Sequence, residues 1–152
     1  MKVSFHKKRD GRIVMTITRS DGSSTWAVLQ AGLEIHDLAH IAVEGTLDLR
    51  DAFFGTVEKG AEIADFEDKA KQPEITTEAK QVEHLVLLLQ IEQQQGSLGS
   101  DFMQQYHDIL REQNLPILPM LDDVSLEEIR SQLTKSVQDL SDLKVGQALV
   151  FE

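Results

Sequence analysis

The amino-acid sequence predicts an α+β protein, in which a small antiparallel sheet packs against about five helices. Two Asp-Gly turns separate short β-type segments within the first 30 residues. Helical periodicity then runs through most of residues 33–66 and 76–142. Residues 147–151 read as a closing strand. Because a sheet with one apolar face needs helices laid across it, these observations together predict a sheet covered by the helical remainder.

The first 30 residues predict a three-stranded meander with turns at residues 10–11 and 21–22. The middle strand places its strongly apolar residues on one face, at Ile13, Met15 and Ile17. Trp26 lies on the third strand and is interpreted as core or hinge packing rather than as a stacking platform. The closing strand at residues 147–151 is expected to join this sheet.

Two helices are predicted between residues 33 and 66. The first covers residues 33–47, with its apolar side at Leu38, Ala39, Ala42, Val43 and Leu47. The second covers roughly residues 51–66. Glycine disfavours helix by about 1 kcal/mol relative to alanine, so close packing or a break is expected at Gly55 or Gly60.

Three further helices follow a polar loop at residues 67–75. A long helix is expected from Thr76 or Thr77 to about Gln95, and its middle is apolar nearly all round, which predicts a central buried helix. Residues 93–100 are expected to break it before the next helix, capped by Ser100 or Asp101. The last helix carries one narrow apolar stripe, at Leu126, Ile129, Leu133, Val137 and Leu140.

Composition limits the classes of function. With 152 residues the chain is long enough to bury a sizeable core, and residues 1–152 are expected to form a single domain. A net charge of −11 repels a phosphate backbone, so no nucleic-acid partner is expected. The basic residues at 7–12 are interpreted as a solvated hairpin tip. The absence of cysteine excludes thiolate metal sites and a cysteine nucleophile.

The chain offers no sequence signal for a membrane. No stretch reaches the roughly 18 consecutive apolar residues of a membrane span, and the N-terminal residues contain no apolar run of the signal-peptide kind. No membrane partner and a cytoplasmic location are therefore expected.

The first predicted helix carries its polar side chains on one arc. On an ideal helix these side chains fall within about 120°, opposite the apolar side: His36, Asp37, His40, Glu44 and Asp48. Two imidazoles four residues apart lie about 6 Å apart along the axis and can share one metal ion. His36 and His40 have this spacing, and Glu44 is the third candidate ligand. Because Glu44 lies about 12 Å along the axis from His36, His40 with Glu44 is a rival pair. The predicted occupant is a divalent metal ion, such as zinc, or a small ligand.

The candidate catalytic residues are Asp37 and Glu44. Asp37 stands where the zinc-protease helix signature has a glutamate, directly after the first histidine, so peptide hydrolysis by that mechanism is not indicated. Asp37 can instead orient a ligating imidazole or act as a general base beside bound water, and Glu44 is the alternative base. Hydrolysis by metal-activated water is the reaction class expected of a catalytic site built this way.

Spacing along the chain does not identify a further ligand. One source is the acidic arc of the second predicted helix, at Glu58, Glu62 and Asp65. The other is His84, which lies in an apolar helix and is interpreted first as a core histidine with one satisfied hydrogen bond.

Two other interpretations of these features remain. The polar arc is also what the solvated face of an amphipathic helix looks like. The chain is alternatively a non-enzymatic interaction or oligomerisation module, in which the apolar stripe of the last helix or a sheet edge makes a homo-oligomer or docks a partner.

Residues 20–66 resemble a group of uncharacterised bacterial proteins. The resemblance lies in SDGSSTW, then HDLAHIAVEG, then DAFFGTVEKGAEIADFE, that is, an HDLxHxxVE helix followed by a Phe-Phe-Gly segment. It covers about the first 65 residues. The resemblance implies that the histidine and acid residues of this helix form a unit with Phe53, Phe54 and Gly55, and it implies no particular reaction.

Overall fold

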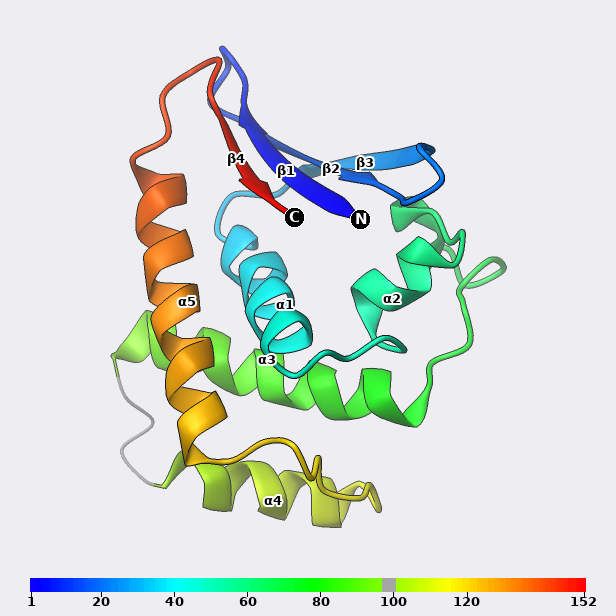
Figure 1. The fold of residues 1–152 in the computed structure, drawn as a ribbon, viewed down its shortest axis with the longest axis vertical. Helices are drawn as coiled ribbons and strands as arrows, with labels where there is room; N and C mark the ends of the chain where they lie inside the picture. Colours follow the sequence, from blue (N-terminus) through cyan, green and yellow to red (C-terminus); the bar gives the residue numbers. More distant parts are fainter. Residues whose placement is uncertain (97–100) are drawn as a thin grey trace.

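A computed structural model of the chain describes residues 1–96 and 101–152. It confirms the α+β fold, with an antiparallel sheet above a group of helices (Figure 1). The strands are β1 (Lys2–Lys7), β2 (Ile13–Thr18), β3 (Ser24–Leu29) and β4 (Ala148–Phe151). Their order is β3-β2-β1-β4, so the closing strand joins the N-terminal meander, as expected, by pairing with β1.

The helices of the described residues follow β3 in the chain. They are α1 (Glu34–Thr46), α2 (Phe53–Glu58), the short 3-10 helix η1 (Ile63–Phe66), α3 (Thr77–Gln95), α4 (Phe102–Glu112) and α5 (Asp123–Ser141). Asp101 caps α4. Of the predicted break at residues 93–100, the first three residues still belong to α3, and residues 97–100 lie outside the described residues. Across residues 1–96 and 101–152, no helix combines the length and apolar character that crossing a bilayer requires.

The prediction of one helix over residues 51–66 is wrong, because the segment divides into α2 and η1. The chain turns at Gly60, whose φ of +114° favours glycine. Gly55 lies inside α2 for a different reason: a Cβ there would stand only 2.1 Å from the carbonyl oxygen of Arg50. Of the two positions where a break or close packing was expected, Gly60 therefore makes the break and Gly55 the close packing.

The two faces of the sheet have different environments. The inner face is buried against the helices through Val3, Phe5, Ile13, Met15 and Ile17. Trp26 pairs with Thr16 in the β2–β3 register, and its side chain is 65% exposed on the outer face. The expectation of core or hinge packing for Trp26 is therefore wrong, because the register of β3 directs this residue away from the helices.

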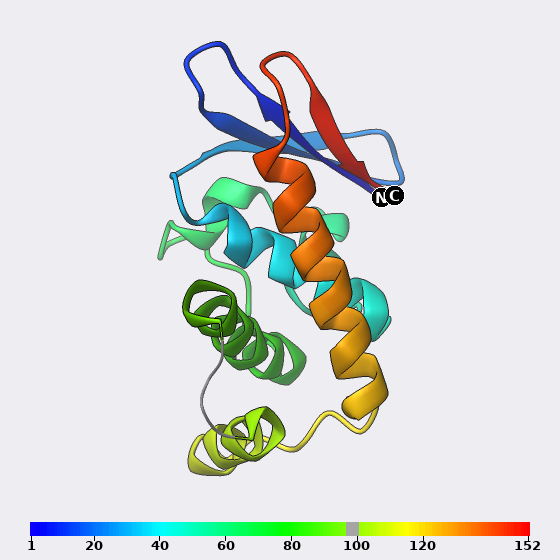
Figure 2. The ribbon, with the colours of Figure 1, turned by 90° about the vertical axis from the view of Figure 1, so that its left-hand side faces the viewer.

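Helix α1 lies under the sheet, between it and α3 (Figure 2). It also packs along α5, whose Leu126, Ile129 and Leu133 are buried. That part of the apolar stripe belongs to the core and is not a free docking surface. Helix α3 is less enclosed than expected, since Leu87 and Ile91 are 42% and 39% exposed.

A buried arginine fixes the chain after α2 against the end of the sheet. Arg19, at the end of β2, donates hydrogen bonds to the carbonyl oxygens of Val57 and Ala61 and pairs with Glu62 at 2.9 Å. Glu58 accepts a hydrogen bond from the backbone of Ser20. The acidic arc proposed as a source of metal ligands is thus engaged in holding this segment. One consequence is the position of η1, whose Phe66 reaches the candidate site.

Candidate metal centre

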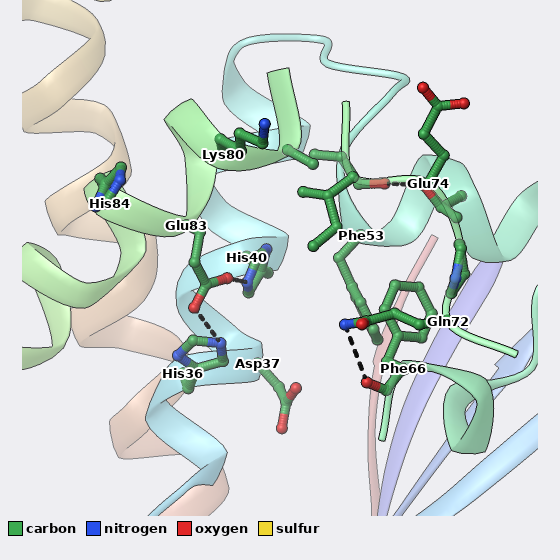
Figure 3. A pocket seen from close by; sticks show the side chains of 15 residues that line it. His36, Asp37, His40, Phe53, Phe66, Gln72, Glu74, Lys80, Glu83 and His84 are labelled. Carbon is green, nitrogen blue, oxygen red and sulfur yellow. Dashed lines mark hydrogen bonds and ion pairs between the residues drawn. The ribbon is translucent and has the colours of Figure 1, made fainter. Parts of the chain in front are cut away.

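Helix α1 places His36 and His40 one turn apart, with ring centroids 4.9 Å apart. Both rings face α3 (Figure 3). His40 is only 4% exposed, whereas the side chain of His36 is 27% exposed. Glu44, one turn further, is 5% exposed. Two of the five residues of the predicted arc are therefore buried, which overturns its interpretation as a solvated helix face.

The third member of the group is Glu83 of α3. Its carboxylate spans the two rings: Oε2 lies 3.2 Å from Nε2 of His40 and Oε1 lies 3.5 Å from Nε2 of His36. One ligand atom from each residue lies within 4.8 Å of the others. Ligand atoms bound at 2.0–2.2 Å to one tetrahedral ion stand about 3.3 Å apart. His36, His40 and Glu83 therefore form a group that could hold a metal ion.

Glu44 lies on the opposite side of the His40 ring from Glu83. The Nδ1–H group of His40 donates to Glu44 Oε1 at 3.0 Å, and the backbone N–H of Phe54 donates to Glu44 Oε2 at 2.9 Å. A carboxylate on the second ring nitrogen is the usual partner of a metal-binding histidine, because it sets the tautomer and the ring orientation. The structure thus gives Glu44 contacts that suit an orienting group, while Glu83 takes the position beside both imidazoles.

The charges of this cluster favour an ionised Glu83 and a protonated His40 when no ion is bound. Burial disfavours the charged ring, but its hydrogen bonds to the carboxylates of Glu44 and Glu83 outweigh this effect and raise the pKa of His40 to about 9. Burial likewise opposes the ionisation of Glu83, yet the His40 contact lowers its pKa below the ordinary value. For His36, burial and the neighbouring charge of His40 lower the pKa. A positive charge at His40 is therefore balanced by the two carboxylates beside it, those of Glu44 and Glu83.

We expect the metal-free protein to lose stability as pH rises from about 6.5 to above 9. The pKa of His40 is about 9 in the folded chain, above about 6.5 in the unfolded chain. The folded state therefore binds the proton more tightly, and this contribution is complete below about pH 6.5 and lost above about pH 9. Urea unfolding in a chelator should show a decrease of about 3 kcal/mol across this window.

A His40→Gln variant provides the control, because it has no imidazole to titrate at this position. Its free energy of unfolding should stay nearly level over the same pH range. Asp37 does not contribute to the change, since its pKa of about 6 lies below the window. A wild-type protein as stable at pH 9.5 as at pH 6.5 would contradict the proposed charge state of His40.

Asp37 lies beside the group on the same helix, and its carboxyl group faces a pocket (Figure 3). Burial raises the pKa of Asp37 to about 6, with the nearby carboxylates of Glu34 and Glu83 acting in the same direction. Within the described residues no hydrogen bond to this carboxyl group is found. A carboxylate whose pKa is close to neutral and whose oxygens accept no hydrogen bond is suited to accept a proton.

The pocket has a volume of about 490 Å³, within the range of small-molecule sites. The candidate metal group forms one end of it, and two aromatic rings form another part of its wall. The ring of Phe53 lies 5.6 Å from that of His40 and 4.8 Å from that of Phe66. The residues before and at the start of α3 close the remaining sides, among them Gln72, Ile75 and Ala79.

Comparison with protein-family models, curated proteins and solved structures finds no match. The resemblance to the proteins with an HDLxHxxVE helix stays a prediction. The structure does bring the residues of that motif together with the Phe-Phe-Gly segment: Phe53 packs on His40, and Phe54 donates to Glu44.

Sequence reasoning placed the two histidines correctly side by side but did not single out Glu83. Glu83 is 43 residues from His40, and no repeat or fixed spacing connects α1 with α3. The local signal was a glutamate and a histidine at positions 83 and 84, directly before the apolar run of residues 85–89. His84, which was considered as a ligand, lines the pocket and is half-buried, outside the group of three.

Proposed function

We propose that this protein binds a divalent metal ion, with zinc as the first candidate, and uses it to hydrolyse a small substrate. His36, His40 and Glu83 are the proposed ligands. The observation that carries the proposal is the spacing of these three side chains at the end of a pocket. Two imidazoles and one carboxylate are the ligand set of several catalytic zinc sites, which keep a further position open for water or substrate.

The environment of the group supports a catalytic rather than a purely structural ion. Structural zinc sites are closed by four protein ligands, whereas the pocket adjoins this group of three. A resident divalent ion would polarise a substrate carbonyl and make bound water more acidic. The same ligand set also suits iron(II), so the metal titrations should include it.

Asp37 is the proposed general base. In the hydrolysis of an amide or ester, the water oxygen forms a bond to the carbonyl carbon while Asp37 accepts a proton from that water. The bond to the leaving nitrogen or oxygen then breaks, and the proton passes from Asp37 to the leaving group. Glu44 has no part in this transfer, because its two oxygens already accept hydrogen bonds from His40 and Phe54.

Metal titration of untagged protein tests the proposal. We expect about one zinc ion per chain with a dissociation constant in the micromolar range or below, measured by calorimetry and elemental analysis. Glu83→Gln and His36→Ala should each weaken binding at least 100-fold, because each removes a ligand. His84→Ala is the matched control, since His84 lines the same pocket but lies outside the group, and it should bind zinc like the wild type.

Two outcomes would overturn the proposal. One is the absence of binding tighter than about 100 µM for zinc, iron(II), manganese and nickel. The other is zinc binding that is equally tight in Glu83→Gln and in the wild type, which would place the ion elsewhere.

A further inference from the structure

The pocket beside the candidate metal group is divided by polarity. Four of its titratable side chains, His36, Asp37, His40 and Glu83, gather at the end formed by α1 and α3 (Figure 3). Lys80 and Glu74 also line the pocket, but their charged ends point away from the rings of Phe53 and Phe66 (Figure 3). The part of the wall between them is mainly aromatic and aliphatic. A ligand that fills both parts must therefore have a polar group at one end and an apolar body at the other.

The apolar part contains large side chains that the described residues cover only in part. Phe53 and Phe66 are half-buried, and their rings lie 4.8 Å apart at an interplanar angle of 53°. Ile75, on the opposite loop, is 51% exposed. Ala52 and Ala79 also line this part of the pocket, and their small side chains leave room for a ligand. Covering such surface removes apolar area from water, so an apolar group bound here gains affinity.

Two polar side chains in this part of the pocket, Thr56 and Gln72, already donate hydrogen bonds to the backbone. The hydroxyl group of Thr56 donates to the carbonyl oxygen of Ala52 at 2.7 Å. The amide nitrogen of Gln72 donates to the carbonyl oxygen of Phe66 at 3.4 Å. A sugar or a nucleotide ribose would bury several hydroxyl groups against this wall without partners, and each of them would weaken binding.

From this division we infer the substrate class of the proposed hydrolase: small amides or esters whose acyl group carries an aromatic ring or a branched apolar chain. The inference rests on the proposed metal site, which would hold the carbonyl oxygen, and it adds that Phe53, Phe66 and Ile75 recognise the acyl group. Phe66 is the informative member of this set, because Phe53 lies between it and His40.

Hydroxamates test the inference, because a hydroxamate binds the metal whatever group it carries. We expect the zinc-loaded protein to bind phenylacetohydroxamate about 30-fold more tightly than acetohydroxamate, measured by calorimetry. Gluconohydroxamate, which carries a polyol chain instead, should bind no more tightly than acetohydroxamate. The difference between the phenyl and methyl probes then measures the apolar wall alone.

Two variants and one control test whether the higher affinity of the phenyl probe comes from the apolar part of the pocket. Phe66→Ala and Ile75→Ser should each lower the ratio of phenylacetohydroxamate to acetohydroxamate affinity at least fivefold. Neither variant should change the binding of zinc or of acetohydroxamate. Ile75→Ser guards against a folding defect in Phe66→Ala, because its side chain is already half exposed. Trp26→Ala removes an exposed aromatic ring on the outer face of the sheet and should change neither probe.

The possible failures are distinguishable. If zinc and acetohydroxamate do not bind, the proposed metal site is wrong. If both bind but the phenyl probe gains less than threefold, or keeps its full gain in both pocket variants, the metal site stands and the inference about the substrate is overturned.

Discussion

Replacing His40 by alanine is expected to lower the free energy of unfolding of the metal-free protein by about 4 kcal/mol at pH 7. The reason is the burial of its partner: Glu44 is 5% exposed, and without the imidazolium its carboxylate keeps only the backbone N–H of Phe54. A buried charge that loses its partner is one of the few causes of so large an effect. Urea unfolding followed by far-ultraviolet circular dichroism measures it.

The two other proposed ligands provide the comparison. The side chain of Glu83 is 46% exposed and that of His36 is 27% exposed. Water can therefore replace many of the hydrogen bonds that a substitution at either position removes. Glu83→Gln and His36→Ala should therefore cost about 1 kcal/mol each or less. All three variants are expected to lose metal binding, but only His40→Ala should lose substantial stability. Equal destabilisation in the three would contradict the distinction between a buried and a half-exposed ligand.

Gly55→Ala is expected to destabilise the protein by about 3 kcal/mol. The added Cβ would stand 2.1 Å from the carbonyl oxygen of Arg50 and 2.4 Å from its carbonyl carbon. Both are backbone atoms, so either α2 or the chain before it has to move. Because Phe53 and Phe54 lie at the start of α2, the movement should also weaken phenylacetohydroxamate binding. Thermal unfolding and calorimetry report the two effects.

Gly45→Ala is the matched control. Gly45 also lies in a helix, but nothing stands within 4 Å of the Cβ that alanine would add there. Alanine should therefore leave the protein unchanged or stabilise it by up to about 1 kcal/mol, as its higher helix propensity predicts. A Gly55→Ala variant as stable as Gly45→Ala would show that the contact with Arg50 does not constrain α2.

The order of strands and helices could largely be predicted from the sequence because the signals for them are local. The Asp-Gly turns fall between β1, β2 and β3, and Gly11 and Gly22 have φ values of +83° and +87°. The helical periodicity of residues 33–47 matches α1 to within a residue at each end. The division of residues 51–66 was less clear, because Arg19 holds the segment through contacts 38 or more residues distant.

Two histidines and two acids share one face of α1, and this follows from their spacing alone, because an α-helix repeats every 3.6 residues whatever surrounds it. The contacts of each of them depend instead on how the helices pack together. The packing of α3 on α1 brings Glu83 to the Nε2 atoms of both histidines, and the start of α2 engages Glu44 behind His40. Contacts between residues far apart in the chain decide which face of a helix is buried and which residue of a second helix packs against it. The spacing of residues within one segment does not predict such contacts.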